Sequence, residues 1–128
     1  MERFEKTKEQ GIHIHCPDGA TPKDGPSAGA AITSVIYSLL SGKSIKNDIA
    51  MTGEIHLQGK ITEIGGLEQK ILGGIRAGVT TFLYPSSNSQ DFDKFMKKCR
   101  DYSALKGIQF MAVSTIEEAF QQLFVLAK

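Results

Sequence analysis

The stretch Thr21-Pro22-Lys23-Asp24-Gly25-Pro26-Ser27-Ala28-Gly29 leads into a predicted helix and carries the features that decide the fold around it. Asp24-Gly25 is a turn dipeptide, and Pro26 suits the first helical position because its missing N–H would have no partner there. Ser27 is therefore predicted to lie in the first helical turn, where unpaired N–H groups and the positive helix end favour developing negative charge. This arrangement suits an acyl-transfer nucleophile, although serine is also common in an ordinary helix start.

The composition is that of an ordinary soluble domain. The chain has 128 residues, of which 41% are hydrophobic and 23% charged, enough for one domain with a modest core. The net charge of +1 gives no argument for nucleic acid, and the basic residues between 94 and 100 are interleaved with aspartates as on a solvated helix face. The apolar stretches are too short to span a membrane or to form a secretory signal. Two distant cysteines, Cys16 and Cys99, fit a reducing compartment, so an intracellular protein is expected.

Strands and helices alternate along the sequence. Strands are predicted over residues 12–16, 48–55, 60–64, 79–84 and 108–113, with the second and third joined in a hairpin at Gly59. Helices are predicted over residues 26–41, 67–77 and 88–100, and after the capping box Ser114-Thr115-Ile116-Glu117, with Gly42 and Gly78 as stops and Asn88 as a cap. This order predicts an α/β fold of α+β character, with a mixed sheet and flanking helices.

A lysine lies on the face of the second predicted helix that should pack inward. Lys70 shares this face with Ile71, so its ammonium is expected either to extend to water or to be partly desolvated. Desolvation lowers the pKa of a lysine and makes it a candidate general base for a serine hydroxyl. Gly73 and Gly74 are costly in mid-helix, so another backbone is expected to approach there and bring this helix close to Ser27.

Other constellations of chemically active residues were weighed against a Ser–Lys pair. His13, His15 or His56 could supply the base of a Ser-His hydrolase, although neither His13 nor His15 has an evident orienting carboxylate. A zinc site from His13, His15 and Cys16 is less favoured because the cysteine falls on the opposite strand face. Gly42-Lys43-Ser44 resembles the end of a phosphate-binding loop, but it ends a helix and lacks the motif's earlier glycine, so ATP binding by this chain is not expected.

The segment from Pro22 to Gly29 resembles the nucleophile motif of the Lon family of ATP-dependent proteases. The resemblance continues through His13-Ile14-His15, Met51-Thr52-Gly53-Glu54-Ile55, Gly59 and Ile64-Gly65-Gly66-Leu67-Glu68-Gln69-Lys70. The interval between Ser27 and Lys70 also equals that between the family's catalytic serine and lysine. The similarity is strong from residue 12 to residue 85 and looser beyond.

This resemblance implies a serine endopeptidase that cleaves unfolded or damaged proteins through a Ser–Lys dyad. Ser27 would attack the peptide carbonyl, and Lys70 would be its base. Thr52 would position the lysine, and Asp24 would lie beside the dyad. Backbone N–H groups around Ser27 would form the oxyanion hole.

The resemblance also sets expectations for the rest of the protein. Residues 12–128 would form a Lon-like proteolytic domain that lacks the family's earliest elements, after a poorly ordered lead-in over residues 1–11. No cofactor or metal is expected in this chain, whereas ATP and Mg²⁺ would bind an ATPase module of the full-length protein. That protein would form a homo-oligomeric, hexameric ring acting on unfolded proteins, without nucleic acid or membrane, in the cytoplasm or an organelle such as the mitochondrial matrix. The alternative function is a catalytically silent domain of the same fold that serves assembly or binding.

Overall fold

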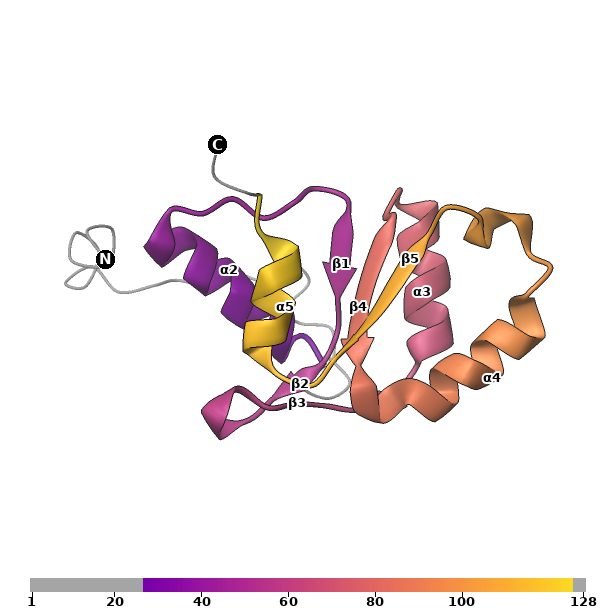
Figure 1. Ribbon diagram of the computed structural model, residues 1–128, viewed down its shortest axis with the longest axis horizontal. Coiled ribbons are helices and arrows are strands. Elements are labelled where there is room, and N and C mark those ends of the chain that lie inside the picture. Colours follow the sequence, from indigo (N-terminus) through magenta and orange to yellow (C-terminus); the bar gives the residue numbers. More distant parts are fainter. Residues whose placement is uncertain (1–26, 126–128) are drawn as a thin grey trace, which may run out of the picture.

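The computed structural model describes residues 27–125, in which α-helices and β-strands alternate (Figure 1). The strands are β1 (Ile49–Met51), β2 (Glu54–Ile55), β3 (Ile61–Thr62), β4 (Thr81–Pro85) and β5 (Gln109–Val113). The α-helices are α2 (Gly29–Ser41), α3 (Leu67–Arg76), α4 (Ser89–Cys99) and α5 (Ile116–Leu123). Three short 3₁₀ helices are η1 (Leu57–Gly59), η2 (Ser86–Asn88) and η3 (Ser103–Leu105). The predicted lead-in and the predicted strand over residues 12–16 lie outside the described residues.

Three strands form a parallel sheet in the order β1-β4-β5, so β4 is central. The register pairs Ile49 with Thr81, and Thr81 with Gln109. β2 and β3 form a separate antiparallel hairpin in which Ile55 is paired with Ile61. The predicted α/β class and the predicted hairpin are therefore confirmed, with the parallel and antiparallel pairings in two different sheets.

Helices cover both faces of the parallel sheet, α2 and α5 on one side and α3 and α4 on the other (Figure 1). β4 contributes to both layers because successive side chains of a strand point to opposite faces. Leu83 packs in one hydrophobic cluster with Ala119 of α5. Phe82 and Tyr84 pack in a second cluster with Ile71 of α3. The domain therefore has two hydrophobic cores that meet at β4.

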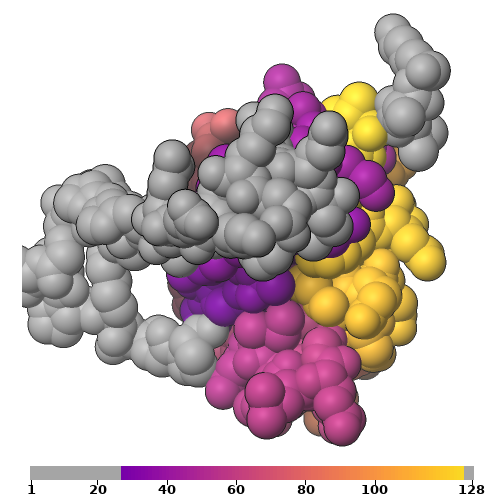
Figure 2. Space-filling view, turned by 90° about the vertical axis from the view of Figure 1, so that its left-hand side faces the viewer, coloured from indigo at the N-terminus to yellow at the C-terminus, as the bar shows by residue number. Residues whose placement is uncertain are grey.

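The β2–β3 hairpin lies beside the start of α5, on the face of the molecule shown in Figure 2. Ile61 N donates a hydrogen bond to Ser114 O at 2.8 Å. Gly59, at the hairpin end, has a φ of 82°, and a Cβ on it would lie 3.0 Å from Ile116 Cγ2. The glycine that turns the hairpin therefore also allows its close approach to α5.

The helix predicted to begin at Pro26 begins at Gly29, with Ala28 as its N-cap residue. The prediction that Ser27 lies in the first helical turn is therefore wrong, and Ser27 lies in the turn just before α2. A long-range contact explains the difference, because Gly53 N donates to Ser27 O at 3.0 Å. This hydrogen bond directs the Ser27 carbonyl toward a neighbouring segment instead of along the helix axis.

The single strand predicted over residues 48–55 is instead two strands that belong to two different sheets. Thr52 and Gly53 separate them and form their own hydrogen bonds. Thr52 N donates to Leu83 O of β4, whereas Gly53 N donates to Ser27 O ahead of α2. The chain changes partner at this point, so continuous strand pairing ends there.

The helix stops predicted at two glycines are confirmed. Gly42 follows α2 with a φ of 76°, and Gly78 lies just beyond α3 with a φ of 92°. Gly42-Lys43-Ser44 is therefore at the negative, C-terminal end of α2, where phosphate binding is not favoured. None of the helices within residues 27–125 is both long and apolar enough to cross a membrane.

The starts of the last two helices differ from the predictions in detail. Asn88 is the N-cap residue of α4, but its side chain makes no capping hydrogen bond and contacts another loop instead. α5 has a capping box shifted by one residue from the predicted Ser114–Glu117 box. Thr115 Oγ1 accepts a hydrogen bond from Glu118 N at 3.3 Å, and the Glu118 carboxylate reaches back to Ser114 N.

Candidate active site

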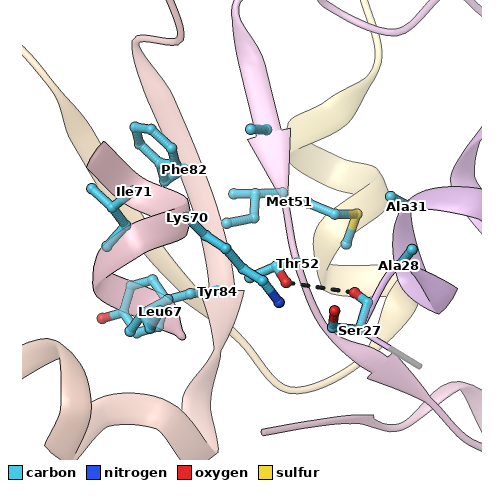
Figure 3. Close-up of a pocket in the computed structure, with 12 residues that line it drawn as sticks. Ser27, Ala28, Ala31, Met51, Thr52, Leu67, Lys70, Ile71, Phe82 and Tyr84 are labelled. Atoms are coloured by element: carbon cyan, nitrogen blue, oxygen red, sulfur yellow. Dashed lines mark hydrogen bonds between the residues drawn. The ribbon is translucent and has the colours of Figure 1, made fainter. Parts of the chain in front are cut away.

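Ser27 is held at the turn before α2 through its backbone carbonyl (Figure 3). Gly53 N donates to Ser27 O at 3.0 Å, and Thr52 Oγ1 donates to the same oxygen at 3.5 Å. In the opposite direction, Ala30 N at the start of α2 donates to Gly53 O at 3.1 Å. Because hydrogen bonds run both ways between Gly53 and this turn, the backbone of Ser27 is tied to the end of β1.

The position of Gly53 excludes any side chain. Gly53 is buried, and its φ of 158° is one that residues with a side chain rarely adopt. A Cβ there would lie 2.5 Å from Ile61 Cγ2 and 3.5 Å from Pro85 Cγ. The preceding residue, Thr52, is itself anchored to β4 by the bond from its N–H to Leu83 O at 3.1 Å. The position of Ser27 therefore depends on both the hairpin and the central strand.

Lys70 is placed by α3, whose first turn is closed by the bond from Lys70 N to Gly66 O at 3.1 Å. Leu67 and Ile71, on either side of it along the helix, are 5% and 1% exposed and anchor this face of α3 in the second core. The side chain of Lys70 keeps contact with solvent and extends toward Thr52 and Ser27 (Figure 3). Partial burial lowers the pKa of Lys70 below its ordinary value.

One cavity of about 320 Å³ joins these residues, because Ser27, Thr52 and Lys70 all line it. The other walls are almost entirely apolar and come from α2, β1, α3 and β4: Ala28, Ala31, Ala50, Met51, Leu67, Ile71, Phe82, Leu83 and Tyr84. This size is within the range of ligand-binding cavities. Apolar walls exclude water and strengthen electrostatic interactions with groups inside.

The mid-helix glycines of α3 have different surroundings. A Cβ on Gly74 would lie 2.5 Å from Phe82 Cε1, whereas a Cβ on Gly73 would meet nothing within 4 Å. The close approach predicted for this helix therefore exists only at Gly74, and an aromatic side chain makes it instead of a backbone. Since Phe82 lines the cavity, Gly74 helps to shape the wall next to Lys70.

Three of the predicted site residues share this cavity, and the remaining one cannot be placed. Ser27, Thr52 and Lys70 come from three different segments of the chain. Asp24, predicted beside them, lies outside the described residues. The structure gives Thr52 Oγ1 a hydrogen bond to the Ser27 carbonyl, so Thr52 is tied to the nucleophile's backbone as well as lying next to the lysine.

Of the alternative bases and ligands, His56 lies within the described residues, and it is away from this cavity. His56 is exposed on the hairpin, where its Nε2 lies 2.9 Å from Thr62 Oγ1, and it does not line the cavity. His13, His15 and Cys16 lie outside the described residues. Within residues 27–125, no group of three His, Cys, Asp or Glu side chains is placed to hold a metal ion.

Sequence reasoning missed two contributors to the site. The sequence pattern places Gly53 in a continuous strand, although a glycine inside a strand pattern is a known sign of a bulge or a close backbone approach. The same pattern places Phe82 in a buried strand, and no local signal connects it with Gly74. Contacts between distant segments define both roles.

Comparison with known families assigns the chain to a class of proteolytic domains, and its mixed helix-and-sheet fold agrees with this. The chain belongs to the family described as the Lon protease (S16) C-terminal proteolytic domain, whose sequence model matches residues 1–126. The resemblance inferred from the motifs is thereby confirmed.

Individual relatives show the same affiliation. The chain is 41% identical over 126 residues to a Lon protease of Neorickettsia sennetsu, an alignment covering 98% of this chain and 14% of that protein. It is 50% identical over 93 residues to a Lon protease of Frankia alni, covering 73% of this chain and 11% of the relative. It is 46% identical over 113 residues to the mitochondrial Lon protease homolog of Candida dubliniensis, covering 88% of this chain and 10% of the relative. The chain therefore spans only a small fraction of these relatives, which include both bacterial and mitochondrial proteins.

Proposed function

We propose that this chain is a serine endopeptidase domain that cleaves unfolded protein substrates through Ser27 and Lys70. The observation that carries the proposal is that these two residues, brought together from the turn before α2 and from α3, line the same cavity. Membership of a family of proteolytic domains supports it. Lys70 is largely exposed, but partial burial beside apolar walls lowers its pKa, and this direction favours the neutral amine that a base needs.

In this mechanism the neutral amine of Lys70 accepts the proton of the Ser27 hydroxyl as Ser27 Oγ forms a bond to the substrate carbonyl carbon. The negative oxygen of the tetrahedral intermediate is stabilised by backbone N–H groups around Ser27, just before the positive end of α2. When the peptide C–N bond breaks, the Lys70 ammonium returns the proton to the leaving amine. Water then attacks the acyl-enzyme ester, with Lys70 again taking and returning the proton.

Two further residues support this dyad. Thr52 keeps the turn before α2 in place through its bond to Ser27 O, and its hydroxyl lies next to the lysine. Asp24 is assigned a place beside the dyad on the strength of the family motif alone. Both are supporting residues in this mechanism, because neither forms a covalent bond with the substrate or takes its proton.

ATP and Mg²⁺ would act on another part of the full-length protein. Gly42-Lys43-Ser44, the segment that resembles part of a phosphate-binding loop, lies at the C-terminal end of α2, which disfavours phosphate. An ATPase module would deliver unfolded chains, and a hexameric ring would enclose the cavity, as the family resemblance implies. The compartment would be the cytoplasm or the mitochondrial matrix, in keeping with relatives of both kinds.

Peptide cleavage by the full-length protein carrying this domain tests the proposal. Ser27→Ala should reduce cleavage of a fluorogenic peptide to background, and Lys70→Ala should reduce it by about 10²–10⁴-fold, the contribution of a general base. Matched controls are Ser44→Ala and Lys97→Ala, both exposed and away from the cavity, which should keep wild-type rates.

A peptide boronate gives a second readout, because boron forms a reversible bond with an activated serine oxygen. Mass spectrometry should find the adduct on Ser27 in the wild type and none in Ser27→Ala. A protein that assembles normally but neither cleaves peptides nor forms the adduct would support the catalytically silent alternative. Retained cleavage in Lys70→Ala would exclude lysine as the base.

A further inference from the structure

We propose that Asn88 is a positioning residue for Lys70, acting through the loop that starts α3. This inference rests on the proposed function for its catalytic consequence, but its structural part concerns only the placement of Lys70. Asn88 is 1% exposed and belongs to neither the cavity nor the catalytic pair.

The Asn88 side chain forms a two-point contact with the backbone of Ile64. Its Oδ1 accepts from Ile64 N at 3.0 Å, and its Nδ2 donates to Ile64 O at 2.9 Å. The same Nδ2 donates to Asp91 Oδ2 at 2.9 Å, which fixes the orientation of the amide. Asn88 therefore holds a segment 24 residues away in the manner of a paired strand. Because these groups are buried, leaving them unpaired would be costly.

The loop that Asn88 holds leads directly into α3, whose start is also fixed by the buried Leu67 and by the ion pair of Glu68 with Lys98 at 3.0 Å. Gly65 and Gly66 connect Ile64 to the helix, and Gly66 adopts a left-handed φ of 70° with no side-chain cap. A Cβ on Gly65 would have nothing within 4 Å, so no side chain packs on that side of the residue. The backbone of Ile64 is thus the last hydrogen-bonded anchor before the turn of α3 that carries Lys70.

The consequence is that a change at Asn88 should move Lys70 relative to the cavity. The first turn of α3 is closed by the bond from Lys70 N to Gly66 O, so a displaced glycine pair shifts this turn directly. A displacement of about 1 Å is enough to reduce a rate by about 10²-fold when it separates reacting groups. It would also change how far the amine is shielded from water.

The test uses Asn88→Asp, which keeps the size of the side chain. The carboxylate can still accept from Ile64 N, but it cannot donate to Ile64 O and it faces the Asp91 carboxylate. The double variant Asn88→Asp/Asp91→Asn restores a donor to the pair and should recover part of the effect. Phe95→Leu is the matched control, since it weakens the same core beside α4 without altering the bonds to Ile64.

The first readout does not depend on catalysis. The pKa of Lys70 is measured by ¹³C NMR of lysine Cε, with the signal assigned through Lys70→Arg. Tyr84 is the only other titratable residue lining the cavity among those described, and burial raises its pKa, so it stays neutral over the working range. We expect the Lys70 pKa to change in Asn88→Asp and to stay at the wild-type value in Phe95→Leu. An unchanged pKa in folded Asn88→Asp overturns the inference.

The second readout is peptide cleavage by the full-length protein. We expect kcat to fall by about 10-fold or more in Asn88→Asp while KM changes little, with partial recovery in the double variant. If Phe95→Leu and Asn88→Asp were equally stable and lost kcat equally, Asn88 would have only a general structural role and the inference would be overturned. If the wild type cleaves nothing but the Lys70 pKa responds to Asn88→Asp, the proposed function fails and the placement of Lys70 by Asn88 stands.

Discussion

Two adjacent glycines of α3 should respond in opposite ways to the same substitution. Alanine is favoured over glycine inside a helix by about 1 kcal/mol, so Gly73→Ala, with nothing within 4 Å of the new methyl group, should stabilise the domain by about that amount. In Gly74→Ala the methyl group would lie 2.5 Å from Phe82 Cε1. Phe82 is 6% exposed and stacks on Phe110 at 5.6 Å, so it cannot swing away cheaply. Overpacking of this kind costs about 1–3 kcal/mol.

The two variants should therefore differ in stability by about 2 kcal/mol, which corresponds to roughly 7 °C in Tm for a chain of 128 residues. Thermal unfolding followed by circular dichroism, with urea unfolding as a second measure, compares them directly with the wild type. The expected order of Tm is Gly73→Ala, then wild type, then Gly74→Ala. If Gly74→Ala were as stable as Gly73→Ala, the close packing of Phe82 under α3 would be refuted. The double variant Gly74→Ala/Phe82→Leu should recover part of the loss, since it removes the ring.

Further predictions concern the pH profile, the turn at Ser27 and the last helix. Because burial lowers the pKa of Lys70 and the neutral amine is the base, the cleavage rate should rise with pH and level off below about 10.4, the ordinary lysine pKa. Stopped-flow assays measure this profile, and a cleavage rate that keeps rising through a pH of about 10.4 would contradict it. Gly53→Ala should lower the free energy of unfolding by about 1–3 kcal/mol and also impair cleavage. The control is Gly107→Asn on the surface, where asparagine tolerates the left-handed φ of 80°, and it should change neither stability nor cleavage. Thr115→Ala removes the acceptor for Glu118 N and should cost about 1 kcal/mol in urea unfolding with kcat unchanged.

Local patterns predicted the elements whose structure is decided locally. α5 follows the predicted capping region, and its apolar residues Ile116, Ala119 and Leu123, spaced three and four apart, are 7%, 0% and 3% exposed. Gly59 turns the hairpin and Gly78 follows α3, because a left-handed φ is an intrinsic property that glycine brings to any context. These features needed no knowledge of distant segments.

The errors arose where a distant segment decides the local structure. The start of α2 and the break after β1 are both set by the bonds between Gly53 and the turn at Ser27. Asn88 has the local signature of a helix cap, but its amide binds Ile64 from another part of the chain. The inward face of Lys70 and the glycines beside it only suggested a pair with Ser27, and the close approach at Gly74 is made by Phe82 instead. The specific pairing came from resemblance to a family.

The two groups of the proposed dyad are attached to different layers of the domain. Ser27 precedes α2 and is hydrogen-bonded to Gly53, on the side of the sheet where α2 and α5 pack. Lys70 belongs to α3, which packs with α4 on the other side. The parallel sheet lies between the two layers, because β1, β4 and β5 each have side chains in both cores. The alignment of nucleophile and base therefore depends on how the two layers pack against this sheet. A substitution that leaves the packing within each layer intact but shifts one layer relative to the other would yield a thermostable protein whose Ser27 and Lys70 are out of alignment. Laboratory evolution of such a variant for restored activity should accordingly select compensating substitutions on the opposite side of the sheet from the original substitution.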